Sequence, residues 1–365
     1  MATAEAGRGA GVGAGTGAGA KERQARLAFI GCGSFASTSL LPNIHRIPEI
    51  DLVAVCDIDR PKAERAARHF GARRVYVDLE EMLDKEELDG VFVIGPAPQQ
   101  AALAPHVLRR GIPVYVEKPS ANTSAEAREL ALLAEKHGVW GQVGFMKRFA
   151  YVYKIAKEIV SRPEFGSLHI IKCKFAQGPY PQIWGIDSAK RSFLIGQVCH
   201  IFDLIRFFGG DVQAVQAFYH EVTPTQFAYV VNLIFTSGAV GQLDLNSLET
   251  KKAFRDISEE LQLVGFETHL VCEDMLNLRW QPPEDFTAAV PETGRYLYTY
   301  TPAWTGISNT RKAFGYEDEV RHFARRCLGL AEGGPDLWDS YKSLLIGEAI
   351  YESAHGGRLV TIKYD

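Results

Sequence analysis

A glycine-rich loop near the start of the chain combines residue types suited to binding a dinucleotide. It reads Gly31-Cys32-Gly33-Ser34-Phe35-Ala36 and lies between a short apolar run and a stretch with helical spacing. Gly31 permits a tight turn, Gly33 lets the backbone approach a pyrophosphate, and Ala36 stands where a third glycine is common. The amides of Ser34 and Phe35, at the helix start, would then face the phosphates. A purely structural turn is the alternative, but the strand before and the helix after favour a cofactor loop.

Asp57 ends the second apolar run, near the distance expected for an acid that binds the adenosine ribose. Its carboxylate would accept hydrogen bonds from the ribose hydroxyls and repel a 2′-phosphate. This predicts NAD as the cofactor, with NADP less favoured. Arg60, three residues further on, could contact a phosphate instead, or it could be a solvated arginine at a helix start.

The elements that position this loop follow a regular rhythm. Strand-like and helix-like segments alternate through LAFIGCGSFASTSLLPNIHRI, IDLVAVCDIDRPKAERAARHFG, VYVDLEEMLDKEELDGVFVIGP and HVLRRGIPVYVEKPSA. Such alternation predicts a doubly wound parallel sheet with right-handed crossovers. The apolar strands VAV, VFVIG and VYV suit burial on both faces of that sheet.

The second half of the chain has a different pattern. Runs rich in β-branched and aromatic residues follow one another with few helices between them, which predicts a largely antiparallel sheet. They are SLHIIKCKFAQ, VQAVQAFYHEV, FAYVVNLIFTS, AVGQLDLNSL, LQLVGFETHLVC and YLYTYTP. In YVVNLIF both faces are apolar, which predicts helices on one side of the sheet and a second subunit on the other. We therefore expect a homodimer or homotetramer.

Several motifs together resemble the glucose–fructose oxidoreductase, inositol dehydrogenase and rhizopine-catabolism (Gfo/Idh/MocA) family. They are the glycine loop, the Cys56-Asp57 pair, Glu117-Lys118-Pro119, GFMKRF at 144–149, His200-x-x-Asp203, and the ending GYEDEVRHF…GRLVTI. The resemblance covers essentially all of the chain after its first residues. It implies an α/β fold, with a Rossmann domain at 26–147 and, at 148–365, an α/β domain for substrate binding and oligomerisation. It also implies cofactor contacts from Gly95, Pro96, Glu117 and Lys118.

The resemblance assigns catalytic roles to Lys118 and His200. Lys118 follows a Rossmann strand at the edge where such sheets bind ligands. In the family it hydrogen-bonds the substrate oxygen, where an ammonium stabilises an alkoxide during hydride transfer. His200 would be the acid/base, and it shares one side of a helix with Asp203. A surface lysine and a packing histidine are the alternatives.

Two departures from the family pattern bear on the substrate. Relatives usually carry an aspartate four residues before the histidine, and this chain has Gly196 there. His200 and Lys118 could work without it, Asp187 could supply the charge, or the chain could be a non-catalytic relative. Gln100 stands where the family commonly has histidine, and Gly95-Pro96 replaces a Thr-Pro turn.

Cationic and aromatic side chains suggest where a polyhydroxylated or anionic ligand would bind. Arg148, Trp184, Lys190 and Asp203 are the predicted substrate-binding residues, with Tyr180 and Arg191 as further candidates for lining the cleft. No His or Cys spacing is typical of a metal site, so no metal is expected.

The composition excludes several other classes of protein. The net charge of −4, with both signs scattered, argues against nucleic-acid binding. No apolar run approaches membrane-spanning length, and six sparse cysteines suggest reduced thiols in a soluble, cytoplasmic protein. Residues 1–25, nearly all Gly, Ala and charge, are expected to be a disordered tail.

Three functions are compatible with these patterns. The leading one is NAD-dependent hydride transfer to or from a sugar, cyclitol or related polyol. The second is glycoside cleavage through transient oxidation and elimination, with NAD recycled in place. The third is a non-catalytic NAD-binding regulator, which the glycine at position 196 suggests.

Overall fold

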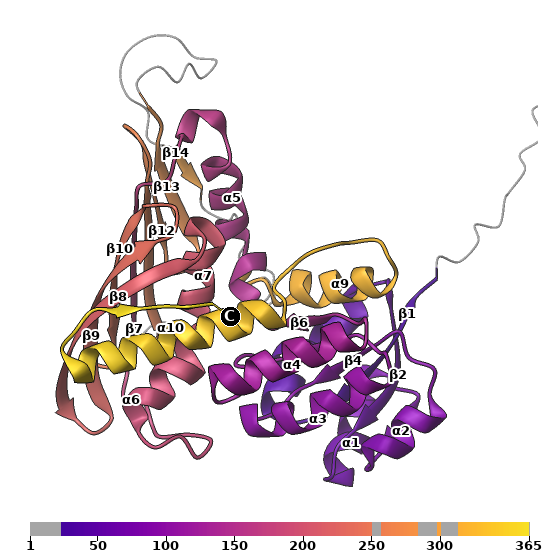
Figure 1. Ribbon diagram of the computed structural model, residues 1–365. Coiled ribbons are helices and arrows are strands. Elements are labelled where there is room, and N and C mark those ends of the chain that lie inside the picture. Colours follow the sequence, from indigo (N-terminus) through magenta and orange to yellow (C-terminus); the bar gives the residue numbers. More distant parts are fainter. Residues whose placement is uncertain (1–22, 250–256, 284–297, 301–312, 365) are drawn as a thin grey trace, which may run out of the picture.

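The computed structural model describes residues 23–249, 257–283, 298–300 and 313–364. Within them the chain forms two sheets with helices around them (Figure 1). Residues 1–22, most of the predicted disordered tail, lie outside the described residues.

The first sheet is parallel, and its order is β3-β2-β1-β4-β5-β6. The strands are β1 (Ala25–Ile30), β2 (Ile50–Cys56), β3 (Arg74–Tyr76), β4 (Gly90–Val93), β5 (Val114–Val116) and β6 (Gly141–Val143). The order reverses direction at β1 and β4, and ligands bind in such sheets beyond the carboxyl ends of the strands at that point. The predicted doubly wound sheet is confirmed.

Helices cover both faces of this sheet, as the apolar strands require (Figure 1). The helices between its strands are α1 (Arg60–Phe70), α2 (Leu79–Lys85), α3 (Ala97–Arg109) and α4 (Ser124–Lys136). After the glycine loop, the expected single helix is instead the π-helical segment η1 (Ala36–Leu40) followed by the 3-10 segment η2 (Leu41–Arg46). Pro42 explains the change, because it lacks the amide that would continue a regular helix.

The second sheet has the order β14-β13-β12-β11-β7-β10-β9-β8-β15, and every pair of neighbours in it is antiparallel except β7 and β10. Its strands are β7 (Ile170–Gln177), β8 (Val212–Thr223), β9 (Gln226–Phe235), β10 (Val240–Asn246), β11 (Ile257–Val264), β12 (His269–Glu273), β13 (Asn277–Gln281), β14 (Tyr298–Tyr300) and β15 (Val360–Thr361). The predicted, largely antiparallel sheet is confirmed.

Helices pack on one face of the second sheet (Figure 1). They are α5 (Tyr151–Val160), α7 (Cys199–Gly209) and α10 (Leu337–Gly356); shorter helical segments are η3 (Met146–Phe149), η4 (Pro163–Phe165), α6 (Ala189–Ser192) and η5 (Phe193–Gln197). The inner face of β9 is fully buried, whereas Val230 and Ile234 on its outer face are 44% and 41% exposed.

Two C-terminal helices join the sheets. Helix α9 (Tyr316–Cys327) packs on the first sheet, where the rings of Phe92 and Phe323 lie 4.8 Å apart. Helix α10 contacts both α4 and β8 (Figure 1). The first sheet ends with β6 at Val143 and the second begins with β7 at Ile170, so the boundary at 147/148 stays a prediction. Helix α9, from beyond that boundary, covers the first sheet.

Among the described helices, no single one has the length and apolar character needed to cross a membrane, although the pair Ala189–Gln197 and Cys199–Gly209, bent by 45°, meets that criterion when taken together.

Candidate active site

A cavity of about 340 Å³ lies at the carboxyl end of the first sheet, beside the glycine loop. Most of the predicted cofactor residues line this cavity, namely Gly33, Ser34, Phe35, Gly95, Pro96, Glu117 and Lys118. Trp184, a predicted substrate residue, lines it too, together with Ala36 and Ile94. The sheet topology explains why these residues lie together. Strands β1, β4 and β5 are parallel neighbours, so the loops that follow them all begin at the carboxyl end of the sheet.

The glycine loop has the geometry of a phosphate cradle. Gly31 has φ +89°, and a β-carbon there would lie 1.9 Å from the Ile94 carbonyl oxygen, so only glycine fits. A β-carbon on Gly33 would meet no atom within 4 Å, which leaves room for a ligand to approach the backbone. The first helical hydrogen bond runs from the Ser37 amide to the Gly33 carbonyl, so the amides of residues 34–36 belong to a first turn. These residues fit a dinucleotide pyrophosphate.

Asp57 braces this loop. Its carboxylate accepts hydrogen bonds from the Cys32 amide at 2.8 Å and from the Asp59 amide at 2.9 Å. Both bonds hold the carboxylate at the end of β2, next to the glycine loop. The predicted contact with the adenosine ribose remains a prediction.

Glu117 and Gly144 show why two of the motifs occur together. The Glu117 carboxylate is buried and accepts hydrogen bonds from the Tyr115 hydroxyl and the Lys118 amide. A β-carbon on Gly144 would lie 2.6–2.8 Å from that carboxyl group, so the glycine of GFMKRF makes room for the glutamate of Glu117-Lys118-Pro119. Burial raises the pKa of Glu117 to about 7, although the charge of Lys118 opposes the shift.

Glu319 of α9 adds a second buried carboxyl group to this cluster. Burial, together with the charge of Glu117, raises its pKa well above the ordinary value. Glu319 is not among the predicted site residues. An acidic residue on the same helix face as Val320 and Phe323, which are both buried, is the signal that could have identified it.

Gln100 is a second residue whose role only the structure reveals. Its side chain is 1% exposed and donates to the carbonyl oxygens of Glu117 at 2.9 Å and Pro119 at 3.1 Å. It also accepts from the Glu117 amide at 2.7 Å. One amide side chain therefore holds the backbone on both sides of Lys118, since it offers a donor and an acceptor together.

Lys118 reaches from the first domain to the second. Its Nζ atom donates to the carbonyl oxygen of Gly196 at 3.1 Å. Gly196 lies in η5, and the helical segments bend by 45° between there and α7. The expected single helix through this stretch is thus broken at a π-helical segment that contains glycine.

His200 lies in the first turn of α7, four residues after Gly196. Its ring is buried, and it meets the Phe145 ring edge-on at 6.1 Å. His200 is not one of the residues that line the cavity, so its acid/base role stays a prediction. The neighbouring Cys199 is buried with a pKa raised to about 11, which does not favour a nucleophilic thiol.

Trp184 comes to the cavity from the segment between β7 and α6. Its backbone has φ +55°, a conformation that is strained for a bulky residue. The Asn122 side chain donates to its carbonyl oxygen at 2.9 Å and so ties the segment to the first domain. Trp184 is the predicted substrate residue that the structure brings next to Lys118.

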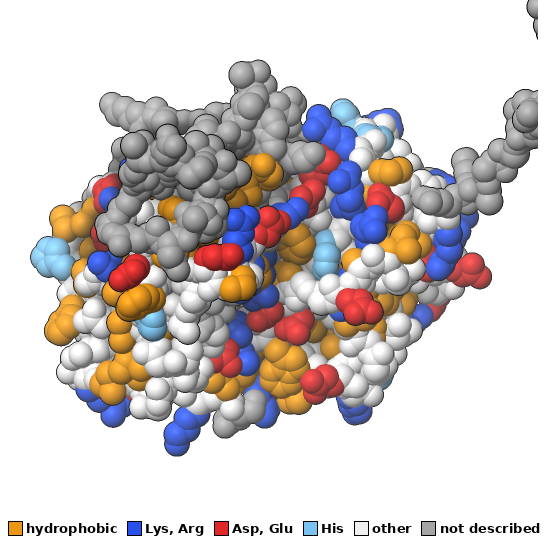
Figure 2. Space-filling view, turned by 90° about the horizontal axis from the view of Figure 1, so that it is seen from above, with side chains coloured by type: hydrophobic (Ala, Val, Ile, Leu, Met, Phe, Trp, Pro, Cys, Tyr) orange, Lys and Arg blue, Asp and Glu red, His pale blue; other side chains and the backbone are white. Residues whose placement is uncertain are grey.

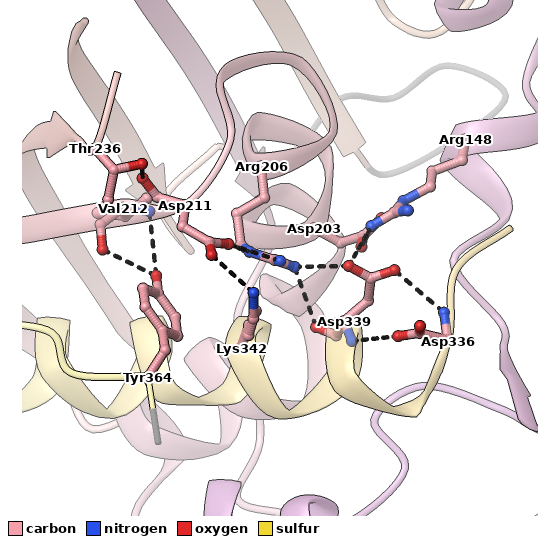
Figure 3. Close-up of polar contacts among 10 residues, drawn as sticks. All are labelled: Arg148, Asp203, Arg206, Asp211, Val212, Thr236, Asp336, Asp339, Lys342 and Tyr364. Atoms are coloured by element: carbon pink, nitrogen blue, oxygen red, sulfur yellow. Dashed lines mark hydrogen bonds and ion pairs between the residues drawn. The ribbon is translucent and has the colours of Figure 1, made fainter. Parts of the chain in front are cut away.

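Arg148 and Asp203 lie in a buried ionic network instead (Figure 3). Two hydrogen bonds, at 2.8 Å and 2.5 Å, join the Arg148 guanidinium to the Asp203 carboxylate, and Asp339 of α10 lies 3.0 Å from the same guanidinium. Arg206 and Asp211 extend the network (Figure 3). These contacts join η3, α7 and α10, and they favour a structural role over direct substrate binding.

Lys190 and Asp187 lie elsewhere. Lys190 pairs with Glu221 of β8 at 2.5 Å, and Asp187 is largely exposed beside Arg191 at 3.3 Å. Neither lines the cavity that contains Lys118. Asp187 is therefore poorly placed to replace a carboxylate at position 196.

All six cysteines are free thiols. Within the part of the chain that the structure describes, no group of three or more His, Cys, Asp or Glu side chains could hold a metal ion.

On the face seen in Figure 2, basic and acidic side chains are interspersed over both halves of the molecule.

Comparison with known proteins identifies the same two parts. Residues 25–145 match the family model for an oxidoreductase family with an NAD-binding Rossmann fold, and residues 153–270 match the GFO/IDH/MocA C-terminal domain.

Individual relatives match along almost their whole length. The chain is 24% identical to inositol 2-dehydrogenase of an Arthrobacter species, over 93% of this chain and 96% of that protein. It is 26% identical to D-apiose dehydrogenase of Paraburkholderia graminis, over 92% and 89%. A dehydrogenase structure from Chromobacterium violaceum has the same fold, with a TM-score of 0.82, 24% identity, and coverage of 92% of this chain and 96% of that one.

Proposed function

Because the chain belongs to the Gfo/Idh/MocA family of oxidoreductases, with its NAD-binding Rossmann fold, we propose that it transfers a hydride between NAD and a carbinol or carbonyl carbon of a sugar, cyclitol or related polyol. The observation that carries this proposal is the position of Lys118. It shares one cavity with the glycine loop and Trp184, and it spans the junction of the two domains.

The chemistry requires a hydride acceptor, a proton acceptor and stabilisation of the substrate oxygen. The glycine loop and Asp57 would hold NAD, which would supply the acceptor for the hydride of the carbinol C–H bond while the hydroxyl proton leaves and a carbonyl forms. The Lys118 ammonium stabilises the negative charge on that oxygen, and His200 receives the proton. Trp184 gives the apolar surface on which the C–H face of a sugar ring can pack.

The names of two relatives support the substrate class, since inositol and D-apiose are both polyhydroxylated. Asp57, at the end of β2, supports a preference for NAD over NADP. The six free thiols suit a reducing compartment such as the cytoplasm. The relatives named dehydrogenases favour net hydride transfer over glycoside cleavage and over a regulator.

The test is a screen of cyclitols, pentoses and hexoses with NAD and with NADP, followed by the absorbance of the reduced nicotinamide. We expect turnover with NAD, and a loss of roughly a hundredfold or more for Lys118→Ala, because the cation beside the developing alkoxide is removed. His200→Ala should cost a similar or smaller factor, with little change in NAD affinity.

The matched control is Lys154→Ala, an exposed lysine paired with Asp318, which should remain as active as wild type. Melting curves establish that each variant is folded. Near-wild-type turnover in Lys118→Ala would overturn the catalytic role of Lys118. A wild type that turns over no polyol with either cofactor would favour a regulator.

A further inference from the structure

Gly196 lies next to a cavity residue, since its carbonyl oxygen accepts a hydrogen bond from Lys118, and the structure shows what fills the space beside its α-carbon. A β-carbon on Gly196 would lie 3.0 Å from the hydroxyl oxygen of Tyr180, 3.0 Å from Ile183 Cδ1 and 3.2 Å from Trp184 Cζ3. All three neighbours come from the segment between β7 and α6. The position is therefore filled by a neighbouring segment, and a larger residue at 196 would displace it.

Tyr180 is held firmly in this place. Its amide donates to the Thr225 carbonyl oxygen at 2.9 Å, and its ring packs edge-on against Phe193 at 5.4 Å. The side chain is 8% exposed. Its hydroxyl makes no hydrogen bond to any residue that the structure describes. Tyr180 is not itself one of the residues that line the cavity, whereas Trp184 of the same segment is.

The hydroxyl lies beside the group that Lys118 contacts. Lys118 Nζ donates to the carbonyl oxygen of Gly196, and the Tyr180 hydroxyl lies 3.0 Å from the position that a β-carbon of the same residue would take. Trp184, four residues after Tyr180, lines the cavity with Lys118. A tyrosine hydroxyl is protonated at neutral pH and can donate, and burial raises the pKa of Tyr180 further above its ordinary value.

We propose that Tyr180 is a substrate-positioning residue, whose hydroxyl donates a hydrogen bond to a substrate oxygen next to the reacting carbon. It occupies the space in which a carboxylate on residue 196 would lie, and it replaces an anionic acceptor with a neutral donor. This proposal rests on the proposed function.

Removal of the hydroxyl tests the proposal directly. Tyr180→Phe keeps the ring packing, so the melting temperature and the NAD dissociation constant should stay at wild-type values. We expect kcat/KM for the best polyol of the screen to fall about tenfold or more. Tyr229→Phe, which removes a buried hydroxyl from β9, is the matched control and should retain full activity.

A double-mutant cycle with Gly196→Ala adds a readout that needs neither cofactor nor turnover. In the wild-type background the new methyl group crowds the Tyr180 hydroxyl, and the melting temperature of the cofactor-free protein should fall. In the Tyr180→Phe background that oxygen is gone, so the same substitution should cost less. Additive effects would contradict the contact.

The outcomes separate this proposal from the proposed function. An active wild type, with Tyr180→Phe within twofold of it, overturns the role of Tyr180 and leaves the dehydrogenase function standing. A wild type that oxidises or reduces no polyol with either cofactor overturns both. A tenfold loss in Tyr180→Phe at unchanged stability supports both.

Discussion

At the scale of single residues, the site depends on how the backbone around Lys118 is held. Gln100 makes three hydrogen bonds to residues 117 and 119, and Glu117 occupies the space above Gly144. A lysine on a flexible loop would sample many positions, whereas this backbone is fixed on both sides of it. The ammonium is thereby preorganised near the cavity.

Gln100→Leu tests this bracing. The substitution leaves one amide and two carbonyl groups around Lys118 without their partner, so we expect a loss of stability of about 1–3 kcal/mol. Lys118 should also be misplaced, and kcat should fall about tenfold while NAD still binds. Turnover of the screened polyol, cofactor titration and urea unfolding measure the three effects.

Gln213→Leu is the control, because Gln213 lies exposed on β8 and does not line the cavity. It should match wild type in all three measurements. A Gln100→Leu variant that loses stability but keeps wild-type kcat would show that Gln100 stabilises the fold without positioning Lys118.

At the scale of elements, the network of Arg148, Asp203 and Asp339 joins η3, α7 and α10 (Figure 3). Helix α7 also carries His200, so the network fixes the helix from which the predicted acid/base projects. Removing one partner from a buried ion pair is costly, because the remaining charge stays buried.

The protonation of Asp203 gives this network a pH dependence. Burial raises the pKa of Asp203 to about 6, although Arg148 opposes the shift. The folded-state pKa thus exceeds the unfolded value of 3.8. At pH values between 3.8 and about 6, the native state therefore binds more protons than the unfolded state. Asp203 therefore contributes stability that is present below pH 3.8 and lost as the pH rises through about 6.

We expect Asp203→Asn to remove this dependence. The unfolding free energy of the wild type relative to the variant should fall as the pH rises from about 4 to 6, because the ionised form of Asp203 is the form that the fold disfavours and the asparagine stays neutral. Urea unfolding across this range measures it. Asp84→Asn, an exposed partner of Arg110, is the control. A constant difference across the range would contradict the assignment.

At the scale of the whole molecule, the helices that the structure describes leave one face of the second sheet uncovered. Cross-strand neighbours on that face include Phe218 beside Val230 and Ile234 beside Val240, all between 41% and 62% exposed. Charged side chains of both signs, such as Lys174 and Asp244, adjoin them. An apolar patch with mixed charges suits a copy of the same surface.

We predict a homodimer or homotetramer assembled through this face. Val230→Glu would place a charge in the centre of the patch, and light scattering at micromolar concentration should then report a smaller mass than for wild type. Leu330→Glu, an exposed leucine after α9, is the control and should leave the mass unchanged. A monomeric wild type would refute the assembly.

The sequence by itself determined the two-sheet architecture and the cofactor loop. The alternation of apolar and polar residues in strands and their helical spacing in helices depend only on residues close in the sequence. These patterns therefore indicate the strands, the crossovers and the glycine turn at Gly31 without any tertiary contact. The Glu117-Lys118-Pro119 motif likewise marked the end of β5, where the cavity lies.

Only the tertiary structure decided which polar side chains meet. Arg148 forms an ion pair with Asp203, and Lys190 forms one with Glu221. Tyr180 packs into the space beside Gly196. No local sequence pattern predicts these partners. The physical reason is that each contact joins segments far apart in the chain. A charged or polar residue binds whichever partner the packing of the sheets and helices brings within reach, and only the fold specifies that partner.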